Sequence, residues 1–186
     1  SWVGLILGLQ FVLWTVSGAM MALLDADAVA GRATRARAGP LAAVRYLAPA
    51  RIAGGGAVTG LTLRDLAGRP VYEVGDGAGT RLVDAVSGAP VAIDRDTAVA
   101  VVATLSPARV AGVARIDRPN LEARDHAGPM WRVDLADAEH SSAYVSATTG
   151  RHLVTRGDTW RMWDFFWMLH NMDYVGRRSF NHPLIV

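Results

Sequence analysis

The hydrophobic positions of the chain begin with one unbroken run from Trp2 to Leu24, which contains no charged residue. As a helix rising about 1.5 Å per residue, this run is about 35 Å long, enough to cross a hydrocarbon core of about 30 Å. A cleaved signal peptide has a shorter apolar stretch, about 7–15 residues, after a basic start. A buried helix of a soluble domain is the other alternative. Length and lack of charge favour a transmembrane helix over residues 1–24.

Two faces of this helix carry signals for packing. Gln10 and Ser17 lie one heptad apart with Trp14 between them, and a polar pair within a membrane usually faces protein rather than lipid. A second face carries small residues, which let helix backbones approach closely in lipid, although glycine is also simply common in such helices. The residues predicted to pack on this face are Gly4, Gly8, Thr15, Gly18 and Ala22.

Short alternating segments follow a linker over residues 25–39. We expect a short helix that starts at Pro40 and ends at Pro49, because proline fits the first turn of a helix and disfavours helix just before it. Residues 58–66, 70–74 and 80–85 alternate well enough to predict strands separated by turns. Residues 94–105 then predict a helix, with Asp94 or Asp96 as its N-cap.

The second half of the chain repeats this order. Residues 69–74 align with 128–133 at an offset of 59, and residues 82–98 align with 144–160 at an offset of 62. Gly88 matches Gly150, so we expect both glycines in the left-handed conformation of a turn. The matched pairs Asp96–Thr97 and Asp158–Thr159 are expected to cap helices. The pattern predicts an α+β fold with two units, residues 40–93 and 94–156, each a helix with three or four antiparallel strands.

Aromatic residues dominate the segment 157–176, which we predict to be an amphipathic helix. Tryptophan and tyrosine favour the membrane–water interface, so an interfacial helix fits, and an aromatic core stripe is the alternative. The spacing of 3, 4, 3 and 4 places on one face Trp160, Trp163, Trp167, His170 and Tyr174. The polar residues predicted to lie off that face are Asp164, Asn171 and Asp173. Residues 181–186 are typical of the start of a second transmembrane helix.

Charge and composition exclude several classes of function. All 19 basic residues are arginine, the net charge is only +2, and there is no cysteine, which excludes disulfides, iron–sulfur clusters and thiol nucleophiles. The only basic cluster is Arg32, Arg35 and Arg37, which either meets anionic headgroups or belongs to a solvated linker. No basic stripe is interleaved with aromatics, so nucleic acid is not an expected partner.

The order of these motifs resembles PepSY-associated transmembrane proteins. The segment WVGLILGLQFVLWTVSGAMM is similar to the first helix of that family. GRPVYEV…TRLVDAVSGAPV and GPMWRV…AYVSATTGRHL resemble two PepSY modules, and WRMWDFFWMLHNMDY…FNHPL resembles the segment before the family's next helix. The resemblance implies two tandem PepSY-like modules outside the bacterial inner membrane, in the periplasm, and a role in binding or regulating an envelope protein or peptide.

The resemblance also implies an alternative function. Some family members are membrane reductases for ferric siderophores that carry haem on membrane histidines, so His170 and His182 become candidate haem ligands. The alternative to haem ligation is that His170 is an interfacial or core histidine with a hydrogen-bond partner, and that His182 is a residue at the start of a helix. His126, His140 and His152 are expected at the surface. Nucleotide, P-loop and protease signatures are missing from the sequence, and Asp84 and Ser146 are expected to cap turns.

Overall fold

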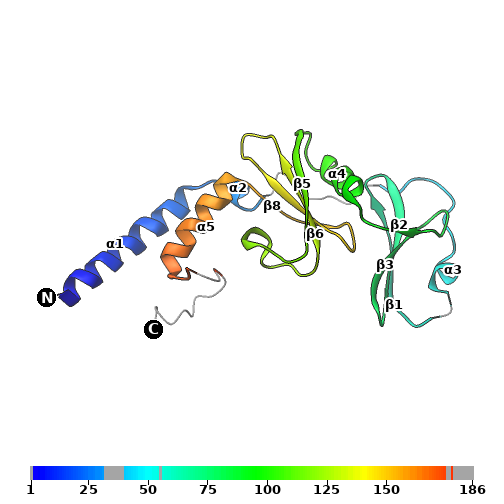
Figure 1. Cartoon of the computed structure of the whole chain (residues 1–186), viewed down its shortest axis with the longest axis horizontal. Coiled ribbons are helices and arrows are strands. Elements are labelled where there is room, and N and C mark those ends of the chain that lie inside the picture. Colours follow the sequence, from blue (N-terminus) through cyan, green and yellow to red (C-terminus); the bar gives the residue numbers. More distant parts are fainter. Residues whose placement is uncertain (1, 32–39, 55, 175–176, 178–186) are drawn as a thin grey trace. The chain divides into compact units, whose positions relative to one another are not determined.

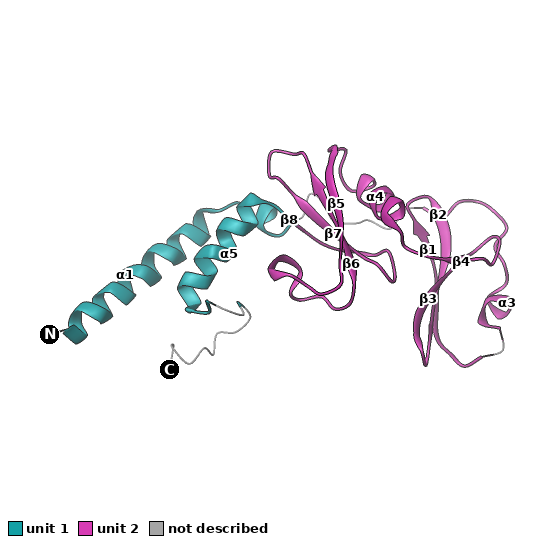
Figure 2. Cartoon of the chain, viewed as in Figure 1, with its two compact units in different colours: residues 1–33, 156–186 teal, residues 34–155 magenta. Residues whose placement is uncertain are grey.

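The computed structural model describes residues 2–31, 40–54, 56–174 and 177. Within them the chain forms two compact units, residues 1–33 with 156–186 and residues 34–155 (Figure 2). The fold is mixed helix and sheet, with an apolar N-terminal helix and two antiparallel four-stranded sheets. The expected class, α+β with an N-terminal apolar helix, is therefore confirmed in this coarse form.

The described part of the first unit is mainly helical. Helix α1, Trp2–Leu23, is the one helix within the described residues that is long and apolar enough to cross a membrane, and almost all of it is exposed. A signal sequence near an N-terminus has the same properties, so the helix is compatible with either role. Short helix α2, Ala26–Val29, follows, and α5, Asp158–Asn171, lies beside α1 (Figure 1).

The second unit holds both sheets, each with its strands in sequential order. The elements of the first are α3 Pro49–Ala53, β1 Val58–Leu66, β2 Arg69–Asp76, β3 Gly79–Asp84 and β4 Pro90–Val91. The elements of the second are α4 Arg95–Ala103, β5 Val110–Ile116, the 3₁₀ turn η2 Leu121–Ala123, β6 Met130–Leu135, β7 Ser142–Ser146 and β8 His152–Arg156. The expected strands are all present, and each sheet has four.

The two sheets have the same strand register. In the first, Val71 pairs with Asp84, and in the second Met130 pairs with Ser146. These pairs are related by the offsets of 59 and 62 that relate the two halves of the sequence. The β-strand hydrogen-bond ladder is therefore built alike in both sheets.

The turns after β3 and β7 are also alike. The N–H of Gly88 donates to the Asp84 carbonyl at 2.9 Å, and that of Gly150 donates to the Ser146 carbonyl at 2.8 Å. Both glycines have positive φ, 78° and 65°, as the sequence predicts. The Asp84 carboxylate and the Ser146 hydroxyl each accept hydrogen bonds from amides of their turn, so both cap it as expected.

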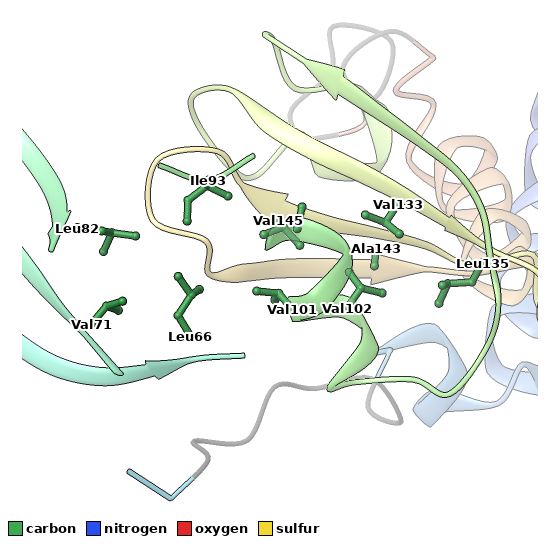
Figure 3. Close-up of a cluster of buried hydrophobic side chains, with 11 residues drawn as sticks. Leu66, Val71, Leu82, Ile93, Val101, Val102, Val133, Leu135, Ala143 and Val145 are labelled. Atoms are coloured by element: carbon green, nitrogen blue, oxygen red, sulfur yellow. The ribbon is translucent and has the colours of Figure 1, made fainter. Parts of the chain in front are cut away.

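The largest hydrophobic cluster joins the two sheets through α4 (Figure 3). Leu66 of the first sheet packs in it with Val101 of α4 and Val145 of the second sheet. Ile93 connects the halves further, because its carbonyl accepts a 2.9 Å hydrogen bond from the Trp131 indole. The opposite face of the first sheet is covered by residues around α3, including Tyr46 and Ile52.

Two helix starts differ from expectation, and a third confirms one of the two expected caps. No helix starts at Pro40; instead α3 begins at Pro49, because the fixed φ of proline suits the first helical position as well as it suits a stop. Helix α4 is capped by Asp94, whose carboxylate accepts from the Thr97 amide at 2.8 Å, and not by Asp96. The cap of α5 is Gly157, so Asp158 is already helical and the expected Asp158–Thr159 cap is wrong.

Candidate membrane-proximal site

Ser17 and His170 bring α1 and α5 together. Ser17 is 1% exposed on a helix whose other side chains are mostly open, and its Oγ lies 3.2 Å from His170 Nδ1. The hydroxyl donates to the Leu13 carbonyl at 2.6 Å, so in a neutral imidazole His170 donates from Nδ1 and Nε2 remains an acceptor. The expectation that this polar pair faces protein is confirmed for Ser17, whose contact orients the histidine ring, and stays a prediction for Gln10.

Gly18 contributes to the same contact. A Cβ on Gly18 would lie 3.4 Å from His170 Cε1, and the Trp14 ring centre lies 6.4 Å from that of His170. The rest of the predicted small-residue face is exposed within this chain: Gly4, Gly8, Thr15 and Ala22. Packing of that face against another helix therefore stays a prediction, whereas Gly18 contacts α5.

The aromatic residues of α5 lie in different environments. Trp160 is buried, with the Arg156 guanidinium carbon 4.2 Å from its ring centre. Trp163 and Trp167 are half-buried and stacked, their ring centres 5.1 Å apart. Tyr174 is 48% exposed and lies beyond the helix, which ends at Asn171, so the predicted helix over 157–176 is too long. An interfacial position for these residues stays a prediction.

Two polar residues of α5 that were expected off its aromatic face, Asp164 and Asn171, are buried. Asp164 is 2% exposed, one helical turn after the buried Trp160, and its Oδ2 accepts from Arg177 Nη1 at 2.6 Å. Asn171 is also buried and donates from its amide to the Trp167 carbonyl. A buried charge requires a close partner, so the arginine makes burial of the Asp164 carboxylate tolerable.

The other histidines divide into two groups. His140 is exposed and His126 partly so, but His152 is half-buried, with Nε2 2.8 Å from Thr155 Oγ1. Burial lowers the pKa of His152 to about 4, so the expectation of a solvated surface residue is wrong for it. His182 lies outside the described residues, and His170 is therefore the one candidate haem ligand whose surroundings are described.

A second polar cluster, absent from the sequence predictions, lies where the two sheets meet. Arg64 Nε donates to Glu73 at 2.8 Å, and Arg151 Nε donates to the same carboxylate oxygen at 3.0 Å. Arg64 also donates to the Thr149 carbonyl in the turn of the second sheet. No local pattern connects these arginines, because they are 87 positions apart. Beside them is a cavity of about 480 Å³ along β1.

Comparisons with protein-family models, curated proteins and solved structures find no match to this chain. Within the described residues no group of three or more histidine, aspartate or glutamate side chains is placed to hold a metal ion.

Proposed function

We propose that this chain belongs to a bacterial inner-membrane protein whose two tandem PepSY-like modules lie in the periplasm and bind or regulate an envelope protein or peptide. The observation that carries the proposal is the duplicated sheet attached to an apolar helix. Besides the common register and turn, each first strand has an irregularity at the same point, before Gly60 in β1 and before Gly112 in β5. Such detailed correspondence favours two copies of one unit.

The polar side chains at equivalent positions support a binding role rather than a catalytic one. Asp84 and Ser146 cap equivalent turns in the two sheets, one with a carboxylate and the other with a hydroxyl. A catalytic position does not tolerate replacement of a carboxylate by a hydroxyl, but a turn cap does. The Tyr144 phenol is engaged as well, since it donates to Glu122 at 2.5 Å and accepts from Asn120 at 3.0 Å. This hydrogen-bond chain ties the η2 segment to the second sheet.

The absence of cysteine makes the location of the modules measurable. Val86→Cys and Leu121→Cys place a thiol at 48% and 46% exposed sites in the two modules, and Ala143→Cys supplies a matched buried control. We expect a membrane-impermeant maleimide to label the first two in intact spheroplasts and the third only after denaturation. Labelling of the exposed pair only after permeabilisation would refute the periplasmic location.

The same variants test for a partner. A thiol-reactive photocrosslinker attached at Val86→Cys or Leu121→Cys in intact cells should give a discrete adduct with another protein that Ala143→Cys does not give. If scanning further exposed positions over both modules also gives no adduct, the binding role is refuted.

The geometry of His170 favours haem binding as a second candidate function. A metal-ligating histidine usually donates its other ring N–H to a fixed partner, and the Ser17 contact provides that partner while leaving Nε2 for iron. His170 would supply one ligand to the haem iron, and His182 or a residue of another helix would supply a second. Haem would supply one-electron chemistry for reduction of a ferric chelate. The described residues meet the requirement for one ligand.

Absorption spectroscopy tests this candidate. The protein purified in detergent should show a Soret band and, after dithionite, sharp α and β bands that His170→Ala abolishes. His126→Ala is the matched control, since it removes an imidazole elsewhere in the chain. A featureless spectrum after haem supplementation, or equal spectra for the two variants, would refute haem ligation by His170.

A further inference from the structure

A cavity runs along the outer edge of β1. Six consecutive residues line it, 62–66 of β1 and Ala67 after it, together with Leu41, with Val101 of α4, with residues 104–105 after that helix, and with residues 150–152. Side chains on one face of a strand alternate, so six residues in sequence line a cavity only when the strand presents its edge. Its volume, about 480 Å³, lies within the range of about 300–1,000 Å³ typical of ligand sites.

The edge of β1 offers main-chain groups to this cavity. The Ala85 N–H donates to the Pro70 carbonyl, so the main chain of Pro70 points toward β3. Asp65 pairs with Pro70, and its own N–H and C=O therefore point away from β2. By the same alternation those of Leu63 and Leu61 also point outward. Among the described residues no strand pairs with this edge, and the Asp65 carbonyl accepts only a long bond from Arg64.

On the face of β1 that carries Arg64, the charge beside the edge is positive. Arg64 and Arg151 share the Glu73 carboxylate; burial opposes its ionisation, but the bonds from both arginines outweigh this and hold its pKa below the usual range. One carboxylate balances one of the two cations. Asp65 follows Arg64 directly, so its side chain lies on the other face of β1, where its Oδ2 accepts from the Gly68 amide in the next turn. Arg64 is 16% exposed, whereas Arg151 is 52% exposed.

We propose that β1 binds an extended peptide segment by strand addition, with an acidic side chain of the peptide held by Arg151. Main-chain groups of Leu63 and Asp65 pair with the peptide backbone, and the apolar lining from Leu41 and Val101 takes alternate side chains. This inference rests on the proposed binding role and identifies its partner as an acidic, extended segment of an envelope protein. The neutral His152 in the lining leaves the positive charge to the arginines.

The probe is a panel of fluorescent heptapeptides with central glutamate and valine, isoleucine, leucine or threonine elsewhere, titrated against the complete chain in detergent. We expect saturable binding that weakens about tenfold when glutamine replaces the glutamate. Arg151→Gln should weaken it similarly, whereas Arg115→Gln should change it less than about twofold. Arg115 of β5 is a matched control, since its side chain is 53% exposed and its Nε lies 3.4 Å from the Asp117 carboxylate.

Two further measurements test the strand geometry. N-methylation of one alternate set of peptide amides should abolish binding and methylation of the other set should not, because only one set faces β1. Bound peptide should slow hydrogen exchange at the Leu63 and Asp65 amides and leave Arg64, already paired with β2, unchanged.

Three results would each overturn the inference: no saturable binding up to about 1 mM peptide, equal effects of the two methylation patterns, or equal effects of the two arginine substitutions. If a crosslinked partner is found while these tests fail, the strand-addition site is wrong and the binding role stands. If no partner is found either, both are wrong.

Discussion

Gly150 provides the most quantitative test of how the two sheets are joined. Its φ is 65°, and a Cβ built on it would lie 2.8 Å from both Ile93 Cδ1 and Leu66 Cδ1, in the cluster shared by the two sheets. Placing alanine in the left-handed conformation costs about 1–2 kcal/mol. Overpacking of a dense core adds about 1–3 kcal/mol. We therefore expect Gly150→Ala to lower the free energy of unfolding by about 2–5 kcal/mol.

Two other glycines separate these contributions. Gly68 also has positive φ, 88°, but has open space around its Cβ direction, so Gly68→Ala should cost only the strain, about 1–2 kcal/mol. Gly77 has open space and no positive φ, so Gly77→Ala should change stability by less than about 1 kcal/mol. Ile93→Val removes one of the clashing methyls and should recover part of the loss in the Gly150→Ala background.

The assay is urea unfolding of the complete chain in mild detergent, followed by circular dichroism at the β-sheet signal. Equal midpoints and slopes for Gly150→Ala and Gly68→Ala would refute the reasoning, because they would mean that the clash relaxes without cost. No recovery with Ile93→Val would show that this side chain does not limit the space.

The remaining predictions concern the polar groups of the second unit. Tyr144→Phe removes a buried donor to Glu122 and should lower the free energy of unfolding in urea by about 1–3 kcal/mol. Burial and the bond to Glu122 raise the pKa of the Tyr144 phenol to about 12. The stability of the unsubstituted protein should therefore fall as the pH rises from about 10 to 12. Asp84→Ser, which introduces the side chain of the equivalent turn, should be about 1 kcal/mol more stable than Asp84→Ala, since a hydroxyl still accepts from the turn amides; equal midpoints would contradict this. Since burial lowers the pKa of His152 to about 4, the unfolded chain binds a proton first, and stability should fall as pH drops from about 6.5 to 4. His152→Gln should flatten that dependence in thermal unfolding, and an unchanged slope would show that other groups cause it.

Local features of the fold were predictable because their causes lie within a few residues. The strands follow from alternation, and the left-handed turns at Gly88 and Gly150 follow from glycine at equivalent positions. The helix boundary at Pro49 was ambiguous, since a proline can follow the end of one helix or be the first residue of the next, and Pro49 is the first residue of α3. The end of α5 was misplaced because the aromatic spacing continues to Tyr174 although the backbone turns left-handed at Met172.

The candidate sites were less predictable. His170 was selected by resemblance, but the sequence did not show that its partner is Ser17, 153 positions away. Asp164 was expected off the aromatic face, and its burial depends on Arg177, which approaches it from beyond the helix. The shared Glu73 carboxylate and the cavity beside β1 had no signal in the sequence at all.

By itself the sequence determined the apolar helix, two similar sets of three or four strands, and the turns between them, because periodicity, proline and glycine act on neighbouring residues. Only the tertiary structure decided which faces are buried and which distant charges meet. Arg64 and Arg151 converge on Glu73 because the Gly150 turn packs against Leu66 and Ile93. Such contacts depend on how whole helices and strands pack, and no local sequence pattern shows which distant residues that packing brings together.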